Sequence, residues 1–196
     1  MTKTEIYNNI KYNENLVRQY QRTISSLQNK NSSLNSQING WNNQISSSNL
    51  RRSQLQSQIS ELTKLKIKYK TLQDNFASRQ SRRSNKLTLN FAQKANTFKF
   101  LSSYVIGMKS LLSGNEYKSA YNGLSAAMET IAKKVKTIQI EIDIITRDIS
   151  TLQSRINANQ NERRATQEKI NQTNGDLAYR QQRIVYWKNQ LSSATD

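Results

Sequence analysis

One apolar repeat runs through most of this sequence and constrains its fold more than any other feature. Apolar side chains recur in alternating steps of three and four residues, an average spacing of 3.5. In the first half the repeat occupies Ile10, Val17, Tyr20, Ile24, Leu27, Leu34, Ile38, Trp41, Ile45, Leu55, Ile59, Leu62, Tyr69, Phe76, Leu87, Phe91, Phe98, Leu101, Val105, Met108 and Leu112. In the second half it occupies Tyr117, Tyr121, Leu124, Met128, Ile131, Val135, Ile138, Ile142, Ile145, Ile149, Leu152, Ile156, Ile170, Leu177, Ile184, Trp187 and Leu191. This spacing keeps one side of an α-helix against a partner helix, which is typical of a coiled coil.

Composition favours long helices with a narrow apolar side over a spherical core. The chain of 196 residues has no proline, five glycines and 35% hydrophobic residues. A domain with many loops would contain more proline and more glycine, because both residues form turns. The sequence therefore predicts an all-α fold, an elongated antiparallel helical hairpin with coiled-coil packing.

We expect residues 1–112 to form a long N-terminal helix, residues 113–116 a turn, residues 117–191 a C-terminal helix and residues 192–196 a tail. Thr2 and Glu5 have the spacing of a capping box, which places a helix start there. The polar segment 77–86 is either a solvated part of the first helix or a break. The repeat keeps its rhythm through Gln80 and Arg83, which favours continuity.

The predicted turn contains Leu112, Ser113, Gly114 and Glu116. Ser113 and Glu116 fit a capping box; alternatively Gly114 ends the first helix and Asn115 caps the second. A hairpin reversing here would place Trp187 opposite Trp41 and leave about 35 N-terminal residues without a partner inside the chain. A break at 77–86 would instead give two arms of similar length with a helical head.

Two sets of seam residues are predicted to bind a partner. One is the isoleucine-rich set of the second helix. It is either the best-packed part of the hairpin or, because β-branched side chains suit packing of three or four helices, a seam that further helices join: Ile131, Val135, Ile138, Ile142, Ile145 and Ile149. The other belongs to the expected unpaired N-terminal segment: Ile10, Val17 and Ile24. The polar positions of the repeat, such as Asn31, Arg52, Asn159 and Arg163, are expected to weaken the coil.

Positive charge is concentrated in the first half of the chain. The formal net charge is +17, and residues 1–115 hold 18 of the 30 Lys and Arg residues but 4 of the 13 acidic ones. The densest basic stripe is Lys64, Lys66, Lys68, Lys70, Arg79, Arg82, Arg83 and Lys86. Such a stripe suits an acidic protein surface, phosphate backbones or acidic lipid headgroups, or it is a solvated face.

The composition argues against catalysis. The chain has no histidine and no cysteine, so the commonest general base and the thiolate metal ligands are missing. Its few carboxylates are scattered, and no phosphate-binding glycine motif occurs. We expect no enzymatic activity, no cofactor and no metal. The N-terminal residues have no apolar signal-peptide core, and no apolar run is long enough to cross a bilayer.

A Ser-, Gln- and Asn-rich first helix is followed by Leu112-Ser113-Gly114, by Tyr117, Tyr121, Leu124 and Met128, and by isoleucine heptads. In these features the chain resembles the WXG-type helical-hairpin superfamily. It is most similar to the small accessory proteins encoded beside LXG toxins in type VII (Esx) secretion loci of Gram-positive bacteria, although Leu112 stands where the family has Trp. The resemblance implies a helical adaptor or chaperone that binds the helical targeting domain of a toxin, with a second small helical protein.

We therefore expect synthesis in the cytoplasm, with any export proceeding without a cleavable signal peptide. The alternative function is that of a basic coiled-coil protein binding nucleic acid or a membrane surface through residues 64–86. A structural element of a fibre is a third interpretation. Nucleic acid is the less favoured partner, because the aromatic residues lie in the repeat rather than among the charges.

Overall fold

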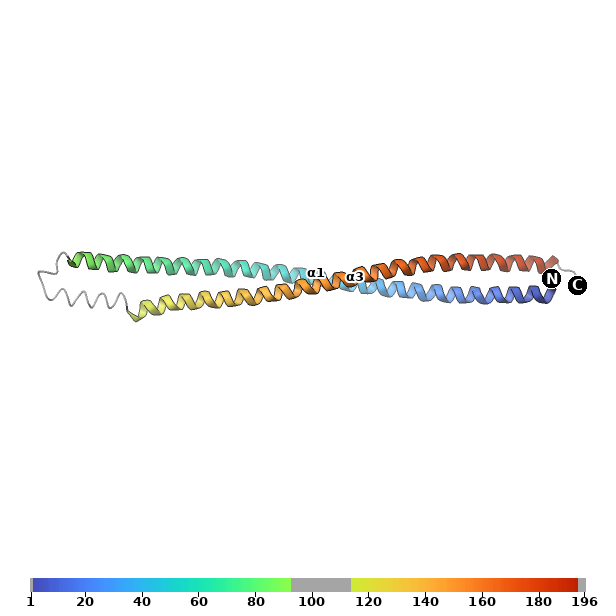
Figure 1. Cartoon of the computed structure of the whole chain (residues 1–196), viewed down its shortest axis with the longest axis horizontal. Coiled ribbons are helices and arrows are strands. Elements are labelled where there is room, and N and C mark those ends of the chain that lie inside the picture. Colours follow the sequence, from blue (N-terminus) through green and yellow to red (C-terminus); the bar gives the residue numbers. More distant parts are fainter. Residues whose placement is uncertain (1, 93–113, 194–196) are drawn as a thin grey trace. The chain divides into compact units, whose positions relative to one another are not determined.

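The computed structural model describes residues 2–92 and 114–193, and all of its regular structure is helical. Helix α1 spans Lys3–Ala92 and helix α3 spans Asn115–Ser193 (Figure 1). The two helices pack against each other, with no strand among the described residues. The predicted all-α antiparallel hairpin is confirmed.

The start of α1 has the predicted capping box. The Glu5 N–H donates to Thr2 Oγ1 at 3.3 Å, and the Thr2 N–H donates to Glu5 Oε2 at 2.8 Å. These bonds satisfy two N–H groups that have no partner within the helix. Helix α1 continues without interruption through 77–86, as the repeat indicated. The remainder of the predicted first helix, residues 93–112, lies outside the described residues.

Helix α3 begins two residues earlier than the sequence indicated. The Gly114 carbonyl accepts hydrogen bonds from the N–H groups of Tyr117 (3.1 Å) and Lys118 (3.3 Å). Gly114 therefore holds the N-cap position, in which the carbonyl is already bonded into the helix. The other predicted turn residues, Leu112 and Ser113, lie outside the described part, as does the side chain of Glu116.

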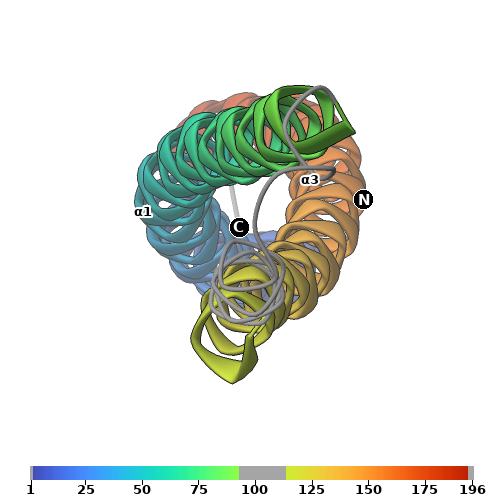
Figure 2. The ribbon, with the colours of Figure 1, turned by 90° about the vertical axis from the view of Figure 1, so that its left-hand side faces the viewer.

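The chain forms two compact units, each containing one segment of each helix. Unit 1 comprises Met1–Ser48 and Arg147–Asp196, and unit 2 comprises Asn49–Thr146. Within each unit the helices run antiparallel and wind around one another, which is visible along the helices in Figure 2. Winding of this kind is what a repeat of 3.5 residues requires of helices with 3.6 residues per turn.

The pairing register differs from the one predicted. Arg163 donates to Asn35, Asn159 donates to Gln37, and Arg180 donates to Asn13. Trp187 precedes Lys188, which pairs with Glu14, so Trp187 lies near Glu14 and not opposite Trp41. The unpartnered N-terminal segment that we expected does not exist. The prediction was wrong because it placed the reversal at Gly114, whereas a heptad repeat tolerates shifts of seven residues.

The seam between the helices is the core of both units, and the predicted repeat occupies it. The buried apolar side chains are Ile6, Ile10, Ile24, Leu34, Ile38, Leu55, Ile131, Ile138, Ile142, Ile156 and Ile170. Apart from Ile6, all of them belong to the predicted repeat. Leu55 and Ile156 are the most completely buried, at 1% and 2% exposed.

The seam of α1 shifts by one residue near its C-terminal end. The repeat predicted Phe76 and Arg83 in the seam, but both are exposed, whereas Ala77 and Ser84 are half-buried. Two successive steps of four residues, from Tyr69 through Gln73 to Ala77, produce this shift, which is called a stutter. A small side chain thereby faces α3, and the Phe76 ring turns to the edge of the interface.

Candidate functional site

The isoleucine-rich residues of α3 build the apolar core of unit 2. Ile138 and Ile142 cluster with Leu55, and Ile145 packs against this cluster together with Ile59 and Leu62. Ile131 is buried, and Val135 is half-buried in the same seam. In unit 1, Ile149 is half-buried. These side chains face α1, so the structure gives them a partner within the chain.

The N-terminal residues predicted to bind a partner are likewise covered. Ile10 and Ile24 are buried and Val17 is half-buried, all in the seam of unit 1. Their segment pairs with the end of α3 through Asn13–Arg180 and Glu14–Lys188. The reason for expecting a second polypeptide at these residues is therefore removed.

Several polar residues of the repeat make contacts between the helices of unit 1. Asn31 Nδ2 donates to Gln167 Oε1 at 3.1 Å, Asn159 Nδ2 to Gln37 Oε1 at 3.0 Å, and Arg163 Nη1 to Asn35 Oδ1 at 2.9 Å. The Lys30–Glu162 ion pair, at 2.7 Å, lies in the same region. We expected such positions to weaken the coil, and that remains a prediction. Paired in this way, they also favour one register of the two helices over others.

The predicted basic stripe divides into two parts. Its eight members are all exposed: Lys64, Lys66, Lys68, Lys70, Arg79, Arg82, Arg83 and Lys86. The four lysines are two residues apart, so successive ones lie about 200° apart around the helix. Lys64 and Lys68 therefore lie on one side of α1 and Lys66 and Lys70 on the opposite side, so the four form no single stripe. The four residues from Arg79 to Lys86 are at positions i, i+3, i+4 and i+7 and share one face.

Unit 2 also exposes large apolar side chains outside the seam. They are Leu50, Leu65, Ile67, Leu72, Phe76, Ile140 and Ile144. Ile140 and Ile144 alternate with the seam isoleucines of α3 and are about half exposed. Leu65 and Leu72 are seven residues apart, and that spacing outside the main repeat was the available signal for a second apolar face on α1.

Two of these exposed residues, Leu72 and Phe76, line an apolar groove with a volume of about 440 Å³. Its lining comes from both helices of unit 2: Leu72, Phe76, Ala120, Gly123 and Leu124. The Phe76 ring stacks on Tyr117 with 4.8 Å between ring centroids and 7° between planes. The ring centroids of Tyr117 and Tyr121 are 6.0 Å apart, so stacked aromatic rings support the Phe76 side of the groove. This groove was not predicted from the sequence.

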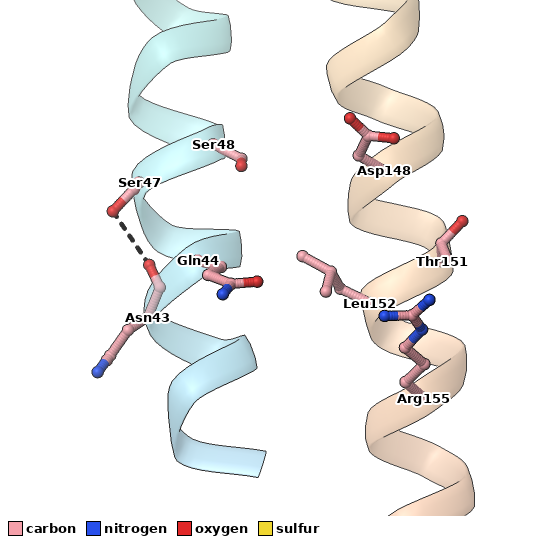
Figure 3. Close-up of a pocket in the computed structure, with 8 residues that line it drawn as sticks. All are labelled: Asn43, Gln44, Ser47, Ser48, Asp148, Thr151, Leu152 and Arg155. Atoms are coloured by element: carbon pink, nitrogen blue, oxygen red, sulfur yellow. Dashed lines mark hydrogen bonds between the residues drawn. The ribbon is translucent and has the colours of Figure 1, made fainter. Parts of the chain in front are cut away.

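A second groove, in unit 1, is lined mostly by polar residues. It has a volume of about 630 Å³ and is lined by Asn43, Gln44, Ser47, Ser48, Asp148, Thr151, Leu152 and Arg155 (Figure 3). Ser47 Oγ donates to the Asn43 carbonyl at 3.1 Å, as in many helices. Asp148 is the single carboxylate among these residues. Nothing in the lining pairs a nucleophile with a general base, so the groove has no evident catalytic chemistry.

Within the described part of the chain, the groups with a shifted pKa belong to surface ion pairs whose members are one helical turn apart. The hydrogen bond from Lys70 to Asp74, and then the charge of Asp74, raise the pKa of Lys70. The hydrogen bond with Lys133, and then its charge, lower the pKa of Glu129. Among the residues described, no three Asp, Glu, His or Cys side chains gather to hold a metal ion.

Neither helix has the character of a membrane span. Within residues 2–92 and 114–193, no helical stretch is sufficiently long and apolar to cross a membrane. The chain matches no known protein family, curated protein or solved structure.

Proposed function

We propose that this protein is a non-enzymatic helical adaptor that binds the helical targeting domain of a toxin and promotes its export by type VII secretion. The observation that carries the proposal is the apolar surface of unit 2 outside its seam, which includes Leu65, Leu72 and Phe76. These three residues share one face of α1, and an exposed apolar face is typical of protein interaction sites. The resemblance to LXG-associated accessory proteins supplies the class of partner.

The location of the binding surface differs from the one expected from sequence. The seam isoleucines, including Ile138 and Ile142, contact the other helix of the chain, so a partner would have to separate the helices to reach them. The exposed side chains of α1 require no such opening. A partner helix lying along this surface would add to the pair without disrupting it.

Co-purification from the native cell tests this function. Tagged wild-type protein should retain a toxin with a helical N-terminal domain, together with a second small helical protein, both identified by mass spectrometry. The double variant Leu65→Asp/Leu72→Asp should lose both proteins, because the charges prevent apolar burial. Leu50→Asp is the control, since Leu50 is also exposed but occupies a different heptad position from Leu65 and Leu72.

Deletion of the gene should also reduce the amount of that toxin in the culture medium. Unchanged toxin export, or the absence of any helical toxin among the retained proteins, would contradict the proposed function.

The second candidate is binding of nucleic acid or an anionic membrane through residues 64–86. It is favoured by the common face of Arg79, Arg82, Arg83 and Lys86. Binding of this kind should weaken steeply as the salt concentration rises. Duplex DNA and vesicles containing acidic lipid, titrated at physiological salt, test it directly. The adjacent apolar residues favour a polypeptide, because a phosphate backbone cannot bury them.

A further inference from the structure

We infer that the apolar groove of unit 2 receives a bulky apolar side chain from an acidic amphipathic helix. This inference rests on the proposed function only in taking the partner to be a helical protein. The groove, the exposed apolar residues beside it and the charge around it each support the assignment.

The groove combines a wide opening with an apolar lining. Leu72 and Phe76 of α1 are 54% and 40% exposed, although both line it. On α3 the lining residues Ala120 and Gly123 are small, and a Cβ atom added at Gly123 would meet no atom within 4 Å. The α3 side therefore leaves room for a side chain from outside, and the α1 side offers it apolar contacts.

The stutter in α1 creates this arrangement. Because Ala77 and not Phe76 faces the seam, the Phe76 ring lies at the edge and stacks on Tyr117. Had the repeat continued without the shift, Phe76 would fill the interface and the groove would lack its aromatic wall.

The charge on the same helical face identifies the chemistry of the occupant. From Leu72 and Phe76, the same alternation of four and three residues continues through Arg79, Arg83 and Lys86. All three cations are exposed, and residues 62–92 contain one acidic residue, Asp74, which pairs with Lys70. A helix with an apolar anchor and carboxylates beyond it would match this order of apolar and basic residues.

A synthetic peptide serves as the probe. It contains about three heptads with Leu at the a and d positions and Glu at e and g, where mutual repulsion keeps it from pairing with itself. The matched control peptide has Lys in place of each Glu. Fluorescence anisotropy of the labelled peptides with the full-length protein should show binding of the Glu peptide and at least about tenfold weaker binding of the Lys peptide.

Gly123→Leu is the decisive variant. The added side chain enters the groove, and leucine also favours the helix more than glycine does, so the fold should be retained or stabilised. We expect affinity for the Glu peptide to fall at least about tenfold. Gly40→Leu and Gly175→Leu are matched controls, because both glycines have open space around them and lie in unit 1. Both should bind as the wild type does.

A charge variant tests the second part of the inference. Arg79→Gln/Arg83→Gln/Lys86→Gln should weaken binding of the Glu peptide and flatten its dependence on salt. Lys64→Gln/Lys118→Gln/Lys136→Gln removes the same charge from residues outside the row of α1 that continues from Leu72 and Phe76, and should have the smaller effect.

The inference would be overturned by failure of the wild type to bind the Glu peptide, by equal binding of the Lys peptide or by unchanged binding in Gly123→Leu. It would also be overturned by a dimer in sedimentation that Gly123→Leu dissociates. The last would mean that a second copy of the chain occupies the groove. Duplex DNA that binds the wild type but not Gly123→Leu would likewise assign the groove to nucleic acid.

The toxin targeting domain separates this inference from the proposed function. If that domain binds the wild type and Gly123→Leu equally, the groove assignment is wrong and the function stands. If the Glu peptide binds in the groove but no toxin co-purifies, the groove assignment stands and the proposed function is wrong.

Discussion

The contacts between the two helices differ in kind between unit 1 and unit 2. Unit 1 joins its helices by several polar contacts, including Asn31–Gln167, Asn35–Arg163 and Lys30–Glu162. Unit 2 has the contiguous apolar cluster of Leu55, Ile138 and Ile142. Polar pairs contribute little net stability but distinguish one register from another, whereas apolar burial stabilises without that selectivity. Both units bury apolar seam residues; the comparison indicates that unit 1 adds polar contacts that favour one register, whereas unit 2 depends on its apolar cluster.

The largest expected effect concerns the apolar cluster. Ile142→Asp should destabilise unit 2 by about 3–5 kcal/mol, because it buries a carboxylate without a partner. Ile144→Asp is the matched control, since Ile144 is two residues away and 47% exposed. Hydrogen exchange and thermal melting followed by circular dichroism measure both. Equal stability of the two variants would contradict the assigned seam.

A buried polar group in unit 2 should have the next largest effect. Gln73 is 3% exposed, and its Nε2 donates to Ser125 Oγ at 2.6 Å. Gln73→Ala should cost about 1–3 kcal/mol, because it removes this bond and leaves a cavity. Gln58→Ala, at an exposed position of the same helix, provides the reference. Urea unfolding distinguishes them, and a cost below that of Gln58→Ala would show that the bond contributes nothing.

Replacement of a buried polar group in unit 1 should raise the free energy of unfolding, whereas the replacement in unit 2 lowers it. Asn13 is 4% exposed and contacts Arg180, so Asn13→Leu should raise stability by about 1 kcal/mol while weakening the preference for one register. The chain has no cysteine, so spin labels on cysteines introduced at Ser26 and Gln172 report the pairing. A second distance population is expected in the variant. A single unchanged distance would mean that other contacts specify the register.

Surface ion pairs should have the smallest effect in either unit. Lys30→Ala in unit 1 and Arg51→Ala in unit 2 each remove an ion pair, to Glu162 and Glu141, whose side chains remain about half exposed. Each should cost about 0.5 kcal/mol or less at low salt and less still at high salt. Denaturant unfolding at two salt concentrations measures this, and a loss of several kcal/mol would give these pairs a structural role that their exposure does not support.

The sequence was sufficient for the fold class, the seam and the first cap. The repeat identified the residues that face the partner helix, and Thr2 with Glu5 identified the start of α1. These features depend on residues close together in the sequence. The helical spacing of Ile138, Ile142 and Ile145 is a local property of this kind.

The register and the candidate site could not be obtained in the same way. An apolar seam remains apolar when one helix slides by a heptad, so the repeat alone is compatible with several pairings. The hydrogen bonds that favour one register over another, such as that between Asn31 and Gln167, join residues far apart in the sequence. The groove depends on Ala77, and not Phe76, facing the seam, and the repeat alone had predicted Phe76 there.

The three glycines inside the helices each follow an asparagine, and this sequence affects the chemical ageing of the protein. Asn39-Gly40, Asn122-Gly123 and Asn174-Gly175 are Asn-Gly sequences, which usually favour tight turns, yet each lies inside a long helix. Deamidation at Asn-Gly requires the backbone nitrogen of glycine to approach the asparagine side chain, and a helical backbone holds the two apart. Loss of ammonia at these three positions therefore reports local unfolding around each. Slow ageing of the protein, followed by mass spectrometry, would record where α1 and α3 open first.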